Sequence, residues 1–141
     1  MKTLIALISV CMVLVACDDP PPPLETPRQD LQTISGSVVF RERIGLTSDA
    51  RLEITLLDVT GPDRPAEKIA TAVSDNPGQS PIDFSLEYDA GLIDEQHRYE
   101  VSARVFDRDR LILVSETAKA VLTDGAGSEI VLYAIRVSQS Q

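Results

Sequence analysis

The chain has 141 residues, a formal net charge of −9 at pH 7, and an apolar fraction of 43%. This length is enough for one domain with a hydrophobic core, but not for two. An acidic chain without tryptophan argues against nucleic-acid binding and against electrostatic docking on anionic lipid, because both surfaces are negatively charged. The two cysteines, Cys11 and Cys17, lie near the start, so the rest of the chain has no thiol for a disulfide, a zinc site or a nucleophile.

Residues 1–16 have the pattern of a secretory signal peptide. A short basic start is followed by a nearly continuous apolar run from Leu4 to Val13, too short to span a bilayer that needs roughly 20 apolar residues. The segment Leu14-Val15-Ala16-Cys17 resembles a bacterial lipobox, which implies cleavage before Cys17 and acylation of its thiol and new amino group. The alternatives are an ordinary buried thiol at Cys17, or cleavage by the general signal peptidase. Cys11 is not an anchor, because branched Val10 precedes it where a small residue is required.

Residues 17–33 are expected to form a disordered, proline-rich tether. The run from Pro20 to Pro23 favours polyproline II, at about 3.1 Å per residue, although such runs also bind aromatic-lined grooves. A multiply acylated Cys17, carrying palmitate-type chains, would hold the protein stably on a membrane, facing the periplasm. Asp18 resembles the signal that retains lipoproteins in the inner membrane of enteric bacteria. It favours the inner membrane, with the outer membrane as the alternative.

Seven segments of the remaining chain show the period-two alternation of half-buried strands. The clearest has Ile82, Phe84, Leu86 and Tyr88 on one face and polar residues on the other. The phase slips near residues 57–59, which predicts a β-bulge. The seven predicted strands span residues 34–41, 51–56, 68–73, 82–89, 99–105, 111–117 and 129–137.

The connections between these segments are short and polar. Residues 107–110 predict a hairpin turn, residues 90–97 a crossing or one helical turn, and no segment predicts a long helix. We therefore expect an all-β domain over residues 34–138, a seven-stranded antiparallel β-sandwich of immunoglobulin or prealbumin type. Tyr99, early in its strand after a polar corner, is a candidate tyrosine corner. The first strand is expected to be an open sheet edge.

Side chains that carry chemistry are few and isolated. His97 is the only histidine and lies in a polar stretch, which favours a solvated loop residue over a metal ligand or a catalytic base. Asp107 and Asp109 alternate with arginines, which indicates a self-neutralising turn in which opposite charges cancel. Asp58 and Asp63 bracket a loop that would need several more oxygens to hold calcium. No catalytic residue, metal site or cofactor site is expected, and the protein is not expected to be an enzyme.

Several short motifs between Gly36 and Leu132 resemble the YbaY/YscW family of bacterial envelope lipoproteins in order and spacing. The resemblance implies a single β-sandwich domain without a catalytic signature. One branch of the family acts as a pilot, a lipoprotein chaperone that helps a type III secretion secretin reach the outer membrane. The matching residues are Gly36-Ser37-Val38, Arg41-Glu42-Arg43-Ile44, Leu46, Ala50, Leu56-Leu57-Asp58-Val59-Thr60, Ala66, Gln79-Ser80-Pro81-Ile82, Phe84, Tyr99 to Arg104, and Leu111 to Thr117.

The expected function is therefore non-catalytic binding or chaperoning of an envelope protein, on the pattern of a secretin pilot. A structural or stress-related envelope lipoprotein without a dedicated client is the first alternative. A carrier of a small apolar ligand is the second, and it would require an apolar cavity. The expected partners are a membrane, through the lipid anchor, and an envelope protein, with no nucleic acid.

Overall fold

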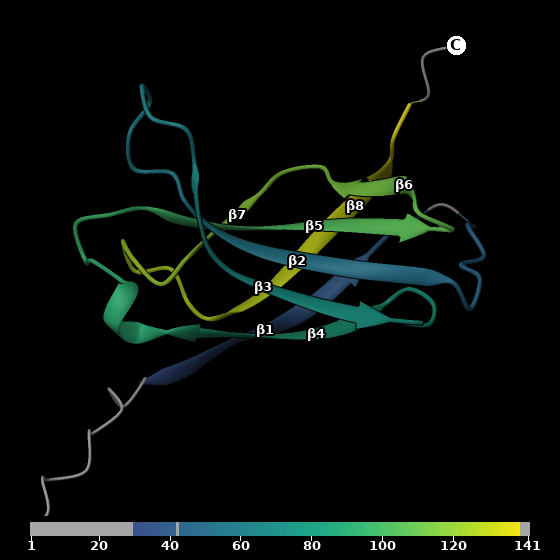
Figure 1. Ribbon diagram of the computed structural model, residues 1–141, viewed down its shortest axis with the longest axis horizontal. Coiled ribbons are helices and arrows are strands. Elements are labelled where there is room, and N and C mark those ends of the chain that lie inside the picture. Colours follow the sequence, from purple (N-terminus) through teal and green to yellow (C-terminus); the bar gives the residue numbers. More distant parts are fainter. Residues whose placement is uncertain (1–29, 42, 139–141) are drawn as a thin grey trace, which may run out of the picture.

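The structure is a computed structural model that describes residues 30–41 and 43–138. The signal peptide, Cys17, Asp18 and the tether as far as residue 29 lie outside the described residues. Those that are described form eight strands and one short 3-10 helix (Figure 1). The strands are β1 (Leu31–Val39), β2 (Ala50–Asp58), β3 (Glu67–Asp75), β4 (Ile82–Asp89), β5 (Tyr99–Asp107), β6 (Arg110–Ser115), β7 (Lys119–Val121) and β8 (Glu129–Arg136), and the helix is η1 (Ala90–Leu92).

The all-β class is confirmed, and the seven-stranded sandwich is wrong. All eight strands belong to one sheet of order β3-β2-β5-β6-β8-β1-β4, with β7 beside β5. The edge strands β3 and β4 approach each other, so the sheet is nearly closed into a barrel. Strand alternation alone cannot distinguish one curled sheet from two facing sheets, because either arrangement buries every second side chain.

Strand β8 joins what would otherwise be two sheets. Its first part runs parallel to β1, from Ser35↔Glu129 to Val39↔Tyr133. Its last three residues pair antiparallel with β6. The predicted sheet is therefore not wholly antiparallel, and β1 is not an open edge, because β4 and β8 flank it on either side. Strand β1 also begins at Leu31, three residues before the expected start at Ile34.

Two local predictions are confirmed, the bulge in β2 and the hairpin of β5 and β6. The β2–β3 register shifts between Leu56 and Leu57, which confirms the bulge. Strands β5 and β6 form the predicted hairpin, with positive φ at Arg108 and Asp109, as tight hairpin turns require. The sequence did not predict β7, because a strand of three residues is too short to show a period of two.

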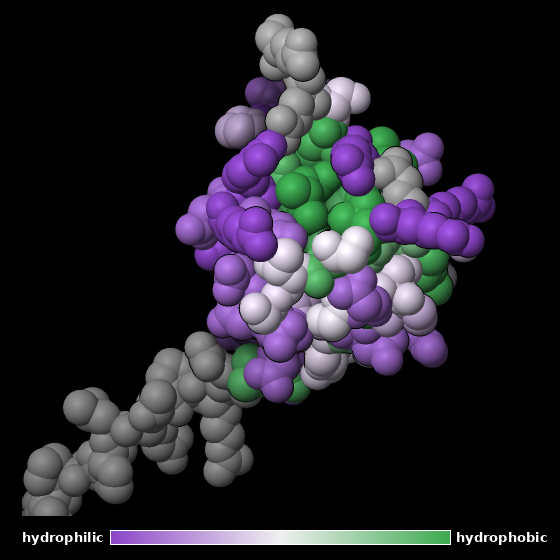
Figure 2. Space-filling model, turned by 90° about the vertical axis from the view of Figure 1, so that its right-hand side faces the viewer, coloured by the Kyte–Doolittle hydropathy of each residue, from purple (hydrophilic) through white to green (hydrophobic). Residues whose placement is uncertain are grey.

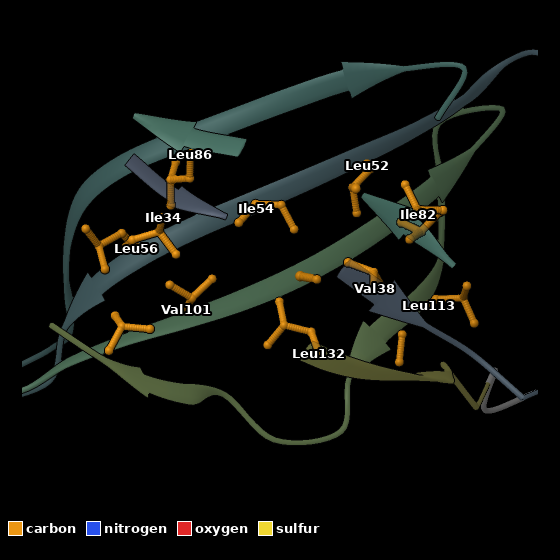
Figure 3. Packing of buried hydrophobic residues seen from close by; sticks show 14 of the residues in the cluster. Ile34, Val38, Leu52, Ile54, Leu56, Ile82, Leu86, Val101, Leu113 and Leu132 are labelled. Carbon is orange, nitrogen blue, oxygen red and sulfur yellow. The ribbon is translucent and has the colours of Figure 1, made fainter. Parts of the chain in front are cut away.

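The core fills the inside of the barrel (Figure 3). The inward side chains of β2, β4 and β5 are buried as the alternation predicted, and Phe84 alone of the four β4 residues is only partly buried. Tyr99 is buried, and its hydroxyl accepts from the Asp94 amide (2.9 Å) and contacts the Leu92 carbonyl (3.5 Å), which confirms the tyrosine corner. In the described part of the chain, no helix is long and apolar enough to cross a membrane.

Candidate functional site

One hollow of the described surface lies at the end of the barrel where β1, β5 and β8 end and β6 begins. We call it the distal mouth, because it lies at the opposite end of the barrel from the start of β1 (Figure 1). Its volume is about 400 Å³. Figure 2 shows apolar side chains exposed at this end and surrounded by hydrophilic ones. The residues that line the distal mouth are Ile44, Arg110, Ile112, Arg136, Val137 and Ser138.

A bulge in β6 places one of these apolar side chains. Val105 of β5 pairs with Leu113, but the next residue, Phe106, pairs with Leu111. Ile112 is thus an extra residue without a partner on β5, and such bulges redirect a side chain. Its carbonyl accepts a hydrogen bond from the Val137 amide at 3.0 Å, which brings the end of β8 to the same place.

The loop between β1 and β2 supplies Ile44 and is held by the β3–β4 loop. Gln79 binds Leu46 twice, accepting from its amide at 3.3 Å and donating to its carbonyl at 3.0 Å. The Ser80 hydroxyl accepts from the Phe40 amide at 3.1 Å. These contacts join loops more than thirty residues apart, so the position of Ile44 depends on the fold and not on local sequence.

A carboxylate from β5 holds the other side of the same loop. Asp107 accepts from the Thr47 hydroxyl at 2.5 Å and from the Thr47 amide at 3.3 Å. The Thr47 hydroxyl is the main reason that the pKa of Asp107 is lowered, against a smaller opposing effect of desolvation. The interpretation of residues 107–110 as a self-neutralising turn is therefore incomplete, because Asp107 also fixes the rim of the distal mouth.

A second apolar surface runs along the outer face of β8. It consists of three alternate residues whose side chains point away from the core: Val131, Tyr133 and Ile135, which are 42%, 48% and 46% exposed. We call these three residues the β8 row. Val39 of β1 pairs with Tyr133, and Val114 of β6 with Ile135, so the row is flanked by partly buried valines. Soluble domains seldom expose contiguous apolar patches without a binding role.

His97 is not the solvated loop residue that was expected. Its side chain is 35% exposed, and Nδ1 lies 2.7 Å from Oδ2 of Asp58, which is buried. Thr60 donates to the other oxygen of Asp58 through its hydroxyl and its amide, and accepts from the Arg98 amide at 2.9 Å. Burial opposes ionisation of Asp58, but the hydrogen bonds from Thr60 and His97 outweigh it and lower the pKa.

These four residues tie the end of β2 to the start of β5 and form a structural corner. Asp63 is not part of it and is exposed. Over residues 30–41 and 43–138, no group of three or more His, Cys, Asp or Glu side chains is placed to hold a metal ion. Sequence reasoning missed the distal mouth altogether, since its residues come from three segments that are far apart in the chain.

Comparison with known proteins places this architecture in a family. The model of the YscW family, described as type III secretion system lipoprotein chaperones, matches residues 29–133. The chain belongs to this family. The YscW match covers all strands from β1 to β7 and most of β8.

Two relatives extend the comparison. The uncharacterized lipoprotein YbaY of Escherichia coli K12 is 28% identical over 94% of this chain and 77% of its own. A solved structure, described as an alternative pilotin from the type II secretion system of Vibrio cholerae, is similar with a TM-score of 0.73 and 38% identity. That similarity covers 77% of this chain and 99% of the pilotin.

The motifs that carried the resemblance now have structural roles near the distal mouth. Ile44 lines it, Leu46 and Gln79 pin its rim loop, and Ser80 holds the end of β1. Gly36 has a different role, because a Cβ there would lie 2.0 Å from the Ile130 carbonyl oxygen of β8. Only glycine permits the close approach of β1 and β8 that joins the sheet.

Proposed function

We propose that the protein is a non-catalytic envelope lipoprotein that binds and escorts an envelope protein, in the manner of a secretin pilot. The observation that carries the proposal is the combination of the YscW family match with the 38% identity to a pilotin over nearly all of that pilotin's length. The lipid on Cys17 would supply position, and the folded domain would supply the contacts.

The surface of the domain supports a binding role over a passive one. A passive envelope protein needs only a uniformly polar exterior, whereas this domain exposes the β8 row and the apolar floor of the distal mouth. The hollow is at the small end of the usual size range of ligand sites, roughly 300–1,000 Å³, and it is open to solvent (Figure 2). It suits a side chain of a partner better than an enclosed small apolar ligand.

Deletion of the gene, followed by fractionation of the membranes, tests the role. In the proposed role, a secretin of the same cell loses its multimers in the outer membrane and accumulates as monomers elsewhere. Wild-type protein restores the multimers. The variant Cys17→Ser, which keeps the folded domain but lacks the acylated thiol, restores binding to the secretin but not its delivery. Normal secretin multimers in the deletion strain would contradict the proposal.

A further inference from the structure

We propose that the distal mouth is the surface that receives the partner, and that it takes an apolar segment carrying carboxylates. The inference rests on the proposed function and adds the chemistry of the partner to it. An apolar side chain of the partner enters between Ile44, Ile112 and Val137. Its acidic side chains, or a terminal carboxylate, pair with Arg110 at the margin.

The charge of the distal mouth is opposite to that of the chain. The protein has a net charge of −9, yet both charged residues among the six that line the hollow are arginines. Arg41 and Arg43 precede Ile44 in the rim loop, and both are exposed. Asp107 accepts two hydrogen bonds from Thr47 and does not line the hollow.

The opposite end of the barrel is acidic. Asp30 precedes β1, Asp89 pairs with Leu31 at its start, and Asp94 and Glu95 follow η1. The hollow on that side is lined by Glu95 and has no basic residue among the described ones that line it. An acidic partner segment is therefore repelled from the end where the tether enters and attracted to the other.

The distal mouth is also the better preformed of the two apolar surfaces. The β8 row is an exposed strip on a sheet, and the charged residues beside Val131 are Asp83 and Glu129, which are both acidic. The distal mouth is concave, and its three apolar side chains are fixed by the β6 bulge, the Val137–Ile112 hydrogen bond and the pinned rim loop. Sites that need no ordering on binding lose less free energy when they are occupied.

Photo-crosslinking in living cells tests the proposal with the full chain. A benzophenone amino acid replaces Ser138, which is exposed and lines the hollow, and in a matched control it replaces Glu87, exposed on β4. We expect position 138 to capture one envelope protein and position 87 not to. Mass spectrometry of the adduct should identify a segment with apolar residues beside acidic ones.

Charge variants give the decisive comparison. Arg110→Glu should lower the yield from position 138 roughly tenfold, as expected for reversing a charge at an interface. Arg110→Lys should retain most of it. Arg64→Glu, the same change in the exposed β2–β3 loop, should leave the yield unchanged. Equal melting temperatures of the Arg110→Glu and Arg64→Glu variants would show that folding is not the cause.

Three results would overturn the docking site: an unchanged yield in Arg110→Glu, an adduct without acidic residues, or adducts with lipid alone. The deletion experiment separates this inference from the proposed function. If secretin multimers depend on the protein but Arg110→Glu leaves capture unchanged, the role stands and the distal mouth is the wrong surface. If multimers form without the protein while position 138 still captures an acidic segment in an Arg110-dependent way, the site stands and the pilot-like role fails.

Discussion

The imidazole of His97 lies against a buried carboxylate: its Nδ1 atom is 2.7 Å from Oδ2 of Asp58. The pair joins two strands that are neighbours in the sheet but whose contacting residues are 39 positions apart in the chain. Thr60 donates a hydrogen bond to the other oxygen of Asp58, so both carboxylate oxygens have a hydrogen-bond partner. A buried and fully bonded carboxylate of this kind contributes to stability in a pH-dependent way.

We predict that Asp58→Asn lowers the free energy of unfolding by about 1–3 kcal/mol at pH 7, because it leaves buried donors poorly satisfied. The folded-state pKa of Asp58 is lowered, so its stabilisation is fully present above the unfolded-state pKa, about 3.9, and is lost as the pH falls through the folded-state value. Urea unfolding between pH 3 and pH 7 should therefore show a weaker loss of stability in acid for the variant. Asp63→Asn, in the exposed loop, should follow the wild type at every pH.

Gly36 provides a test of the sheet topology. Gly36→Ala places a methyl group 2.0 Å from the Ile130 carbonyl oxygen, where only a backbone shift can relieve the clash. We expect a loss of at least about 3 kcal/mol, at the upper end of the usual cost of overpacking. Gly45→Ala is the control, since a Cβ at that position meets nothing within 4 Å. Equal stability of the two variants in urea would contradict the parallel β1–β8 pairing.

The core of β4 can be tested by two neighbouring substitutions. Leu86 is fully buried and Glu87 is exposed on the other face of the same strand. Leu86→Ala should cost about 2–5 kcal/mol, whereas Glu87→Ala should change stability by no more than about 0.5 kcal/mol. Similar losses from both, measured by thermal unfolding, would mean that the strand is buried on both faces.

Substitution of Thr47 tests whether its hydrogen bond to Asp107 holds the rim loop of the distal mouth in place. Thr47→Val keeps the shape of the side chain but removes the hydroxyl that donates to Asp107. Hydrogen exchange of the amides from residue 44 to residue 49 should become faster, while exchange in β2 stays the same. Thr71→Val, at an exposed position on β3, should leave the loop unaffected. Unchanged protection in Thr47→Val would show that the loop is ordered without Asp107.

Strand positions and their buried faces were predictable because a period of two reports directly on burial. Leu52, Ile54, Val101 and Val105 all lie inside as their alternation predicted. The order of the strands was not predictable, because it depends on how β8 divides its hydrogen bonds between β1 and β6. That division rests on contacts between the two ends of the domain, and no local pattern reports on them.

The candidate site was less accessible to sequence reasoning than the fold. The bulge at Leu57 left a slip in the alternation, whereas Ile112 lies in an apolar run where an extra residue leaves no visible slip. Likewise, the Asp58–His97 pair could not be found from two polar residues that lie 39 positions apart in the chain. The resemblance to a family indicated a binding role, but it did not indicate which surface binds.

Anchoring at Cys17 remains a prediction that intact-mass measurement can check. The protein purified from membranes should lack residues 1–16 and carry the mass of acyl chains, because the Leu14-Val15-Ala16-Cys17 segment resembles a lipobox. Cys17→Ser should remain an uncleaved or mislocalised precursor. An unmodified Cys17 in the mature wild-type protein would contradict the anchor, and with it the inner-membrane preference assigned to Asp18.

The most direct test of the account is whether the purified protein forms a complex with a secretin of the same cell. Full-length protein in detergent, titrated with that secretin and followed by calorimetry, should show saturable binding that Arg110→Glu weakens and Arg64→Glu does not. Absence of binding to every secretin that the cell makes would contradict the pilot-like role.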